Sequence, residues 1–155
     1  MTAFLAQPLK APAESLFVVA VALWTGAVVF YSLLVLPTLF ASMPSARAGE
    51  VAALVFPRYY HGGLLLGAAM LVSAAYLSAT TGGPWRWVLL VCVIMLGAQA
   101  VSAFGVGPRM AVLRGDETAR AEFMRLHGIA MALGTVVMAS GLGLLVSVRR
   151  LLGRP

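Results

Sequence analysis

Four stretches of this chain carry no charged residue, and each is long enough to cross a lipid bilayer. They cover residues 15–46, 59–85, 87–108 and 126–148. A transmembrane helix requires roughly 18 or more consecutive apolar residues. Charged residues make up only 10% of the chain, whereas about a quarter is usual for a soluble domain. The pattern predicts an all-α integral membrane protein and leaves no room for a soluble catalytic domain.

The predicted architecture is a four-helix bundle that forms a single transmembrane domain over residues 1–155. The expected spans lie at about residues 15–40, 59–79, 85–107 and 126–148. An even number of spans places both termini on the same side of the membrane. The short connection over residues 80–84 predicts that the second and third helices form an antiparallel hairpin. Pro37 predicts a bend near the end of the first span, because proline cannot donate a backbone hydrogen bond.

The basic residues are placed for contact with lipid headgroups and not with nucleic acid. The net charge is +6, and most Lys and Arg residues flank the apolar stretches. Five of these cations fall on the side of the termini and six on the other side, so their count predicts no orientation. One of the five is Arg154. We expect a bacterial cytoplasmic membrane as the location. In the last connection, Asp116 with Arg120 and Glu122 with Arg125 are spaced to pair along a helix.

The interior of the spans offers little acid–base chemistry. Apart from Arg86 at the very start of the third span, no Asp, Glu, Lys or Arg lies inside a predicted span, whereas ion-coupled transporters usually place such groups there. Gln99 is predicted to form a hydrogen bond between helices. The single cysteine, Cys92, excludes an intrachain disulfide and is expected to pack in the core. No motif for a catalytic nucleophile occurs, so the sequence favours a non-enzymatic protein with no catalytic residues.

Small residues recur four positions apart in three of the predicted spans. Such pairs let membrane helices approach closely, either inside the bundle or between copies of the chain. Bundle packing is the main expectation, and dimerisation through Gly63 and Gly67 is an additional one. The pairs are Ala22 with Gly26, Gly63 with Gly67, Gly128 with Ala132, and Ala139 with Gly143.

The first and third connections must share one membrane face, and that face gathers the candidate ligands of the chain. The candidate cofactor-binding residues are His61, His127, Arg58 and Arg109, and the candidate metal-binding residues are His61, His127, Met124 and Met131. Two imidazoles could ligate a b-type haem with the arginines near its propionates. Imidazole with thioether ligands suits copper instead. The third interpretation needs no cofactor: the histidines form ordinary hydrogen bonds, and the methionines fill gaps in the core.

A second set of residues resembles a known family. The stretch LWTGAVVFYSLLVLPTLFASMPSARAGEVAALVFPRYY (residues 23–60) is similar to the opening of the small four-helix membrane proteins typified by transmembrane protein 205. Pro108 with Arg109, and Leu126 with His127, resemble the junction between the third and fourth helices of that family. The resemblance implies a four-span membrane protein and no settled activity. The main landmarks of the first block are Trp24, Gly26, Phe30, Pro37, Phe40, Pro57, Arg58 and Tyr59.

A looser similarity extends to copper-resistance D proteins and to HemJ-type protoporphyrinogen oxidases. It rests on the spacing of Trp24 with Gly26, and of Pro37 with Phe40. The oxidase type carries a histidine on its first helix before the tryptophan, whereas this chain has Phe17, Val18 and Val19 in that region. The leading prediction is therefore a structural or accessory subunit that packs on itself or on a larger membrane complex. Copper handling and haem binding are its alternatives.

Overall fold

The computed structural model of the protein describes residues 9–153. Four helical segments in this range are long and apolar enough to cross a membrane, and no strand occurs among the described residues. They run over Lys10–Ser42, Ser45–Thr81, Trp85–Leu113 and Glu117–Leu152. The prediction of an all-α four-helix membrane bundle is confirmed. Arg154, which entered the charge count, lies outside the described residues.

Two of the four segments are interrupted by a short stretch of π-helix. The first segment consists of α2 (Lys10–Phe30), the π-helix η1 (Tyr31–Val35) and α3 (Leu36–Ser42). The second is the single helix α4 (Ser45–Thr81). The third consists of α5 (Trp85–Ala100), the π-helix η2 (Val101–Val106) and α6 (Gly107–Leu113). A short 3-10 helix, η3 (Glu117–Ala119), then leads into α7 (Arg120–Leu152).

The helices extend beyond the spans expected from the sequence. Helix α4 begins at Ser45, inside the stretch predicted to be a polar connection, and is 37 residues long. At 1.5 Å per residue it measures about 55 Å, whereas the hydrocarbon core of a bilayer is about 30 Å thick. The added turns are held by packing, because Ala48 and Ala52 are buried. The helix ends therefore reach into the headgroup region or tilt across the bilayer.

Glycines make the two tight connections possible. Gly82 and Gly83, with φ of 64° and 55°, lie between α4 and α5, a backbone region that is costly for residues with a Cβ. This turn confirms the predicted antiparallel hairpin. Gly115, with φ of 84°, follows α6. Next to it, Arg114 donates a hydrogen bond of 2.9 Å to the carbonyl of Gly49, which confirms that the first and third connections share one face.

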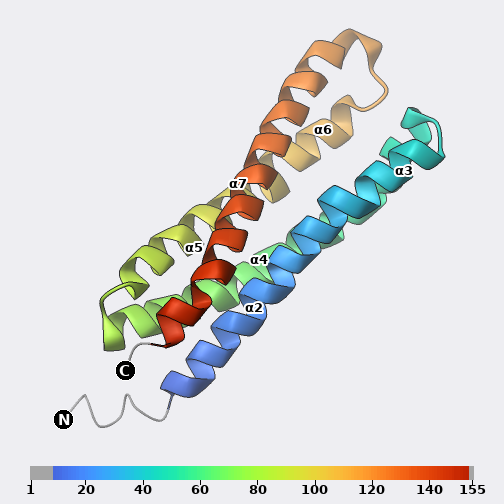
Figure 1. Cartoon of the computed structure of the whole chain (residues 1–155). Helices are drawn as coiled ribbons and strands as arrows, with labels where there is room; N and C mark the ends of the chain where they lie inside the picture. Colours follow the sequence, from blue (N-terminus) through green and yellow to red (C-terminus); the bar gives the residue numbers. More distant parts are fainter. Residues whose placement is uncertain (1–8, 154–155) are drawn as a thin grey trace.

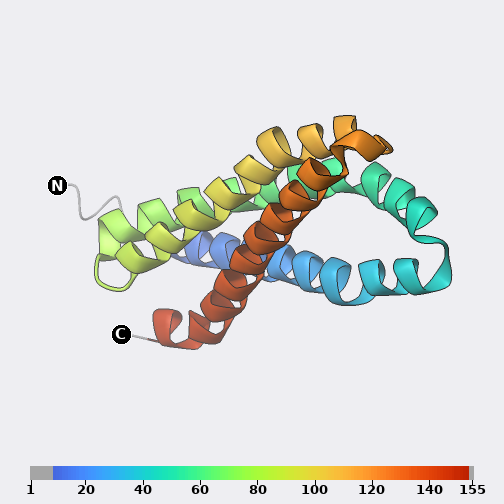
Figure 2. The same ribbon diagram turned by 90° about the horizontal axis from the view of Figure 1, so that it is seen from above.

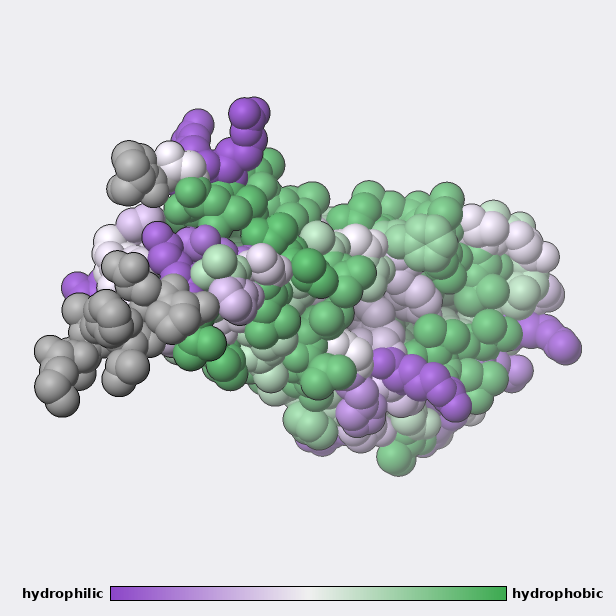
Figure 3. All heavy atoms as spheres, turned by 90° about the horizontal axis from the view of Figure 1, so that it is seen from below, coloured by the Kyte–Doolittle hydropathy of each residue, from purple (hydrophilic) through white to green (hydrophobic). Residues whose placement is uncertain are grey.

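The bundle packs around α2 and α4. Helix α4 contacts both α2 and α5, and α7 crosses α2 and α5 (Figures 1 and 2). Helix α2 begins and α7 ends at the same end of the bundle, as expected for four spans. Cys92 is 1% exposed and packs in the core, as predicted. Outside, a broad apolar surface lies between groups of charged side chains (Figure 3). The largest fully buried side chains are Trp24, Phe17, Met70, Leu77 and Met95.

The charge pairs predicted in the third connection are wrong. Glu122 pairs with Arg109 at 3.1 Å, and Arg120 pairs with Glu117 at 3.7 Å. Asp116 instead accepts hydrogen bonds from the backbone N–H and the hydroxyl of Thr118. A residue that precedes a helix caps its free N–H groups, and this role competes with pairing along the helix.

Candidate functional site

A buried tryptophan lies at the centre of the bundle, against two glycines of a neighbouring helix. Trp24 on α2 is 1% exposed. A Cβ at Gly63 would lie 3.0 Å from the indole nitrogen of Trp24, and a Cβ at Gly67 would lie 2.8 Å from its ring carbon Cζ3. The small residues at these two positions therefore serve packing within the bundle. The predicted dimerisation through Gly63 and Gly67 is wrong in this arrangement, because both glycines are buried beneath Trp24.

Gln99 joins the same region from α5. Its Nε2 atom donates a hydrogen bond of 3.2 Å to the backbone carbonyl of Tyr60 on α4, so the predicted hydrogen bond between helices is confirmed. The side chain is 3% exposed. A Cβ at Gly63 would collide with the Gln99 amide as well as with Trp24. Gly63 thus allows an indole and an amide from two other helices to meet at one point on α4.

One turn away, four aromatic rings pack against one another. Tyr31 stacks on Tyr59 with ring centroids 5.2 Å apart, and Phe56 stacks on Tyr60 at 5.5 Å. Tyr31 also meets the edge of Phe56 at 5.5 Å. Paired aromatic rings stabilise a fold beyond the area that they bury. Phe56 and Tyr59 therefore join α4 to the first helical segment, a role that the sequence did not predict.

Both π-helices lie beside this aromatic cluster and precede a proline. In η1 the N–H of Leu36 bonds to the carbonyl of Tyr31, and Pro37 follows. In η2 the N–H of Gly107 bonds to the carbonyl of Ser102, and Pro108 follows. Proline removes one hydrogen bond from the helix and crowds the preceding turn, and a wider turn relieves that crowding. A π-helix thus precedes Pro37, the residue at which the sequence predicts a bend.

The centre of the bundle contains three buried polar atoms with no hydrogen-bond partner among the described residues. They are the Trp24 indole nitrogen, the Thr25 hydroxyl and the Tyr31 hydroxyl. Thr25 faces Gly141 on α7, where a Cβ would collide with its hydroxyl. None of these groups is charged at neutral pH, so this region offers hydrogen bonding and close packing but no acid–base pair.

The place where Trp24, Gly63 and Gln99 meet is called the central contact below.

The residues predicted to bind a cofactor or metal lie on the surface of the bundle. His61 and His127 are both exposed. His61 Nδ1 lies 2.6 Å from the carbonyl of Pro57, one turn earlier on α4. His127 stacks on the ring of Phe123, with centroids 6.4 Å apart. Met124 and Met131 are 56% and 61% exposed, so the interpretation of these two methionines as core filling is wrong.

The two arginines of the predicted site have other partners. Arg58 donates to the carbonyl of Leu54 at 3.1 Å, and Arg109 pairs with Glu122. Within residues 9–153, no hydrogen bond or ion pair joins any two of the six predicted residues, and no group of three or more His, Cys, Asp or Glu side chains could hold a metal ion. The hydrogen bond from Arg114 to Gly49 places the first and third connections together, but His61 lies well inside α4, which begins at Ser45, and no hydrogen bond or ion pair joins it to the other candidate ligands among the described residues.

The comparison with protein families places the central contact inside a recognised domain. A family model described as a domain of unknown function, DUF4149, matches residues 19–119, which is more than half of the chain. The chain belongs to the DUF4149 family. No curated protein and no solved structure matches it. The matched region holds Trp24, Gly63, Gln99 and both π-helices, and it ends where α7 begins.

The DUF4149 description carries no activity, so the similarity to the proteins typified by transmembrane protein 205 remains a prediction.

The sequence did contain signals for the central contact. Gln99 is the strongest polar group inside a span, and Gly63 and Gly67 stand four apart. Their partner could not be found from spacing alone, because the contact joins positions far apart in the chain. For the two π-helices the sequence held only one signal, which is the proline near the end of the first and of the third helical segment.

Proposed function

We propose that this DUF4149 protein is a non-enzymatic structural or accessory subunit embedded in a membrane. Its helix α7 packs on a second copy of the chain or on a larger membrane complex. A bacterial cytoplasmic membrane is the proposed location. The observation that carries the proposal is the outward face of α7. In the apolar 18-residue stretch of the last segment, Glu117–Leu152, only 17% is buried, whereas 33% is buried in the corresponding stretch of each of the other three segments.

The outward face of α7 is lined by small residues. Gly128, Ala132, Ala139 and Gly143 are all exposed, and their spacing places them within about 60° of one another around the helix. The buried residues Val137 and Leu144 project from the opposite side of the helix. A Cβ at Gly128 or Gly143 would meet nothing within 4 Å. Small residues that face outward allow a second helix to approach closely, whereas contact with lipid alone does not require them.

Disulfide crosslinking within the membrane tests this packing. A cysteine at position 139 (Ala139→Cys) should form a covalent dimer on mild oxidation, or a covalent link to a partner protein of fixed mass. The matched control is Leu65→Cys on α4, because Leu65 is 74% exposed and points away from the bundle. The native Cys92 can stay, because it is 1% exposed. A protein that remains a lone monomer in the membrane and in mild detergent would contradict the proposal.

Copper handling is the second candidate function, and the hydrogen bond of His61 favours it. The carbonyl of Pro57 can only accept, so a neutral His61 donates from Nδ1 and leaves Nε2 as a free ligand atom. Metal-binding histidines commonly donate their other N–H to a backbone carbonyl in this way. Elemental analysis of the purified protein tests it: copper that is bound by the wild type and lost in His61→Ala would support a metal site.

Haem b binding through His61 and His127 is the remaining alternative. It requires both imidazoles to reach one iron, from exposed positions on α4 and α7. An absorption spectrum of the protein in mild detergent, oxidised and then reduced, tests this idea directly. A Soret band that shifts on reduction would support haem, and a featureless spectrum would exclude a low-spin haem.

A further inference from the structure

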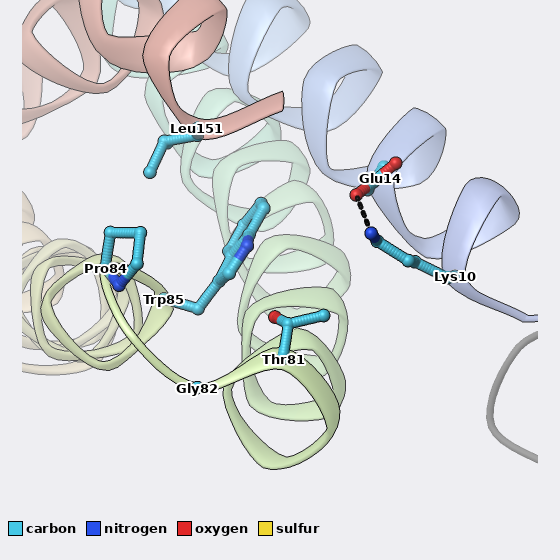
Figure 4. Close-up of a pocket in the computed structure, with 7 residues that line it drawn as sticks. All are labelled: Lys10, Glu14, Thr81, Gly82, Pro84, Trp85 and Leu151. Atoms are coloured by element: carbon cyan, nitrogen blue, oxygen red, sulfur yellow. Dashed lines mark ion pairs between the residues drawn. The ribbon is translucent and has the colours of Figure 1, made fainter. Parts of the chain in front are cut away.

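The end of the bundle that holds the α4–α5 turn contains a small hollow with both signs of charge. Its volume is about 230 Å³, and it lies between the start of α2, the α4–α5 turn and the end of α7 (Figure 4). Lys10 and Glu14 form its charged side, and Thr81 adds a hydroxyl. Pro84, Trp85 and Leu151 form its apolar side. The hollow is smaller than the roughly 300–1,000 Å³ of pockets that enclose drug-sized ligands.

The apolar side of the hollow is held rigidly. Trp85 is 4% exposed, and its ring meets Phe17 of α2 edge-on, with centroids 5.2 Å apart. In Figure 4 the indole stands between Leu151 and Thr81, and Lys10 and Glu14 face it from α2. Tryptophan is enriched where the apolar interior of a membrane meets its headgroups. The hollow therefore lies at the depth of a lipid headgroup, and the apolar part of such a lipid would face the indole.

The charged side of the hollow is only loosely paired with itself. Lys10 Nζ and Glu14 Oε1 are 3.9 Å apart, and their side chains are 50% and 25% exposed. A strong bond between an ammonium and a carboxylate is about 2.7–2.9 Å long. Both groups can therefore accept a further charged partner. Because the pair is neutral as a whole, it suits a zwitterion better than an anion, which Glu14 would repel.

We propose that this hollow binds the zwitterionic headgroup of an aminophospholipid, with Lys10 on the phosphate and Glu14 on the primary ammonium. Glu14 distinguishes ethanolamine from choline, because a primary ammonium donates hydrogen bonds to a carboxylate and a quaternary ammonium has no N–H to donate. The acyl chains leave along the apolar surface of the bundle. This site uses none of the small residues on the outward face of α7, and it requires no metal.

Native mass spectrometry of the full-length protein tests the proposal, using added phosphatidylethanolamine, phosphatidylcholine and phosphatidylglycerol of matched acyl chains. The wild type should retain phosphatidylethanolamine over the other two lipids. Glu14→Gln should reduce the preference for ethanolamine over choline by about tenfold, which corresponds to about 1.4 kcal/mol. Lys10→Gln should weaken the binding of both zwitterionic lipids, and Lys10→Arg should restore it. Equal retention of the three lipids by the wild type would overturn the proposal.

The opposite end of the bundle supplies the matched control. Arg120 and Glu117 also form an exposed ion pair, at 3.7 Å, but neither residue lines this hollow. Glu117→Gln should therefore leave the lipid preference unchanged, and an equal loss in this variant would overturn the proposal. Soluble phosphoethanolamine should bind far more weakly than the lipid, since it has no acyl chains to hold it at this depth. Equal affinity would overturn the assignment to a lipid.

Discussion

Trp24 of α2 lies against Gly63 of α4 so closely that a Cβ at position 63 would be 3.0 Å from the indole nitrogen. The same Cβ would collide with the amide of Gln99 from α5. Three of the four helical segments therefore meet at a glycine. In a membrane, where lipid competes with every apolar contact, this close approach contributes to helix association through packing and hydrogen bonding.

Gly63→Ala should destabilise the protein by about 1–3 kcal/mol, because the added methyl group forces the indole and the amide apart. Thermal unfolding in detergent measures the loss. Gly62→Ala is the matched control, since a Cβ at Gly62 would meet nothing within 4 Å. It should be as stable as the wild type or slightly more stable, because alanine favours a helix over glycine. Equal effects of the two variants would show that the central contact is not tightly packed.

Gln99→Leu should lower the free energy of unfolding by about 0.6 kcal/mol, the average contribution of a hydrogen bond between membrane helices. The variant removes the bond of 3.2 Å to the carbonyl of Tyr60 and keeps most of the side-chain volume. Unfolding in a mixture of mild and denaturing detergents would detect the change. A variant with unaltered stability would mean that this bond contributes nothing beyond packing.

Thr25→Val should not lower the free energy of unfolding and should raise it by up to about 1 kcal/mol, because the substitution removes a buried hydroxyl that lacks a partner. The Thr25 hydroxyl has none among residues 9–153. Thr135→Val on α7 serves as the comparison, since its exposed hydroxyl donates to the carbonyl of Met131 at 2.9 Å. The same unfolding assay applies. A clear loss of stability in Thr25→Val would reveal a partner, such as an internal water molecule.

Asp116 should make the start of η3 sensitive to acid. Hydrogen bonds from the Thr118 hydroxyl and then from its backbone N–H lower the pKa of Asp116 below its ordinary value of 3.8. The ionised carboxylate therefore stabilises this cap fully above pH 3.8, and the contribution disappears as the pH falls through the lowered pKa. Hydrogen exchange of the Thr118 amide should accelerate over that acidic range. Asp116→Asn should remove this pH dependence, because asparagine caps without titrating.

The sequence alone was sufficient for the architecture. Long charge-free stretches have few folds available, because backbone groups in lipid must be paired within a helix. The count of four helices, the hairpin closed by Gly82 and Gly83, the hydrogen bond of Gln99 and the burial of Cys92 all follow from local chemistry. Each depends on the type of a residue and on its position along the chain.

The tertiary structure decided which residues meet. Gly63 and Gly67 could face a second chain or the bundle interior, and only the position of Trp24 shows that they face inward. The sequence predicts that His61 and His127 share a membrane face, yet in the structure each ring has a partner on its own helix, the Pro57 carbonyl for His61 and the Phe123 ring for His127. The hollow beside Trp85 combines residues from the beginning, middle and end of the chain. Such contacts depend on how helices cross and rotate, and spacing within one helix determines only which residues share a face.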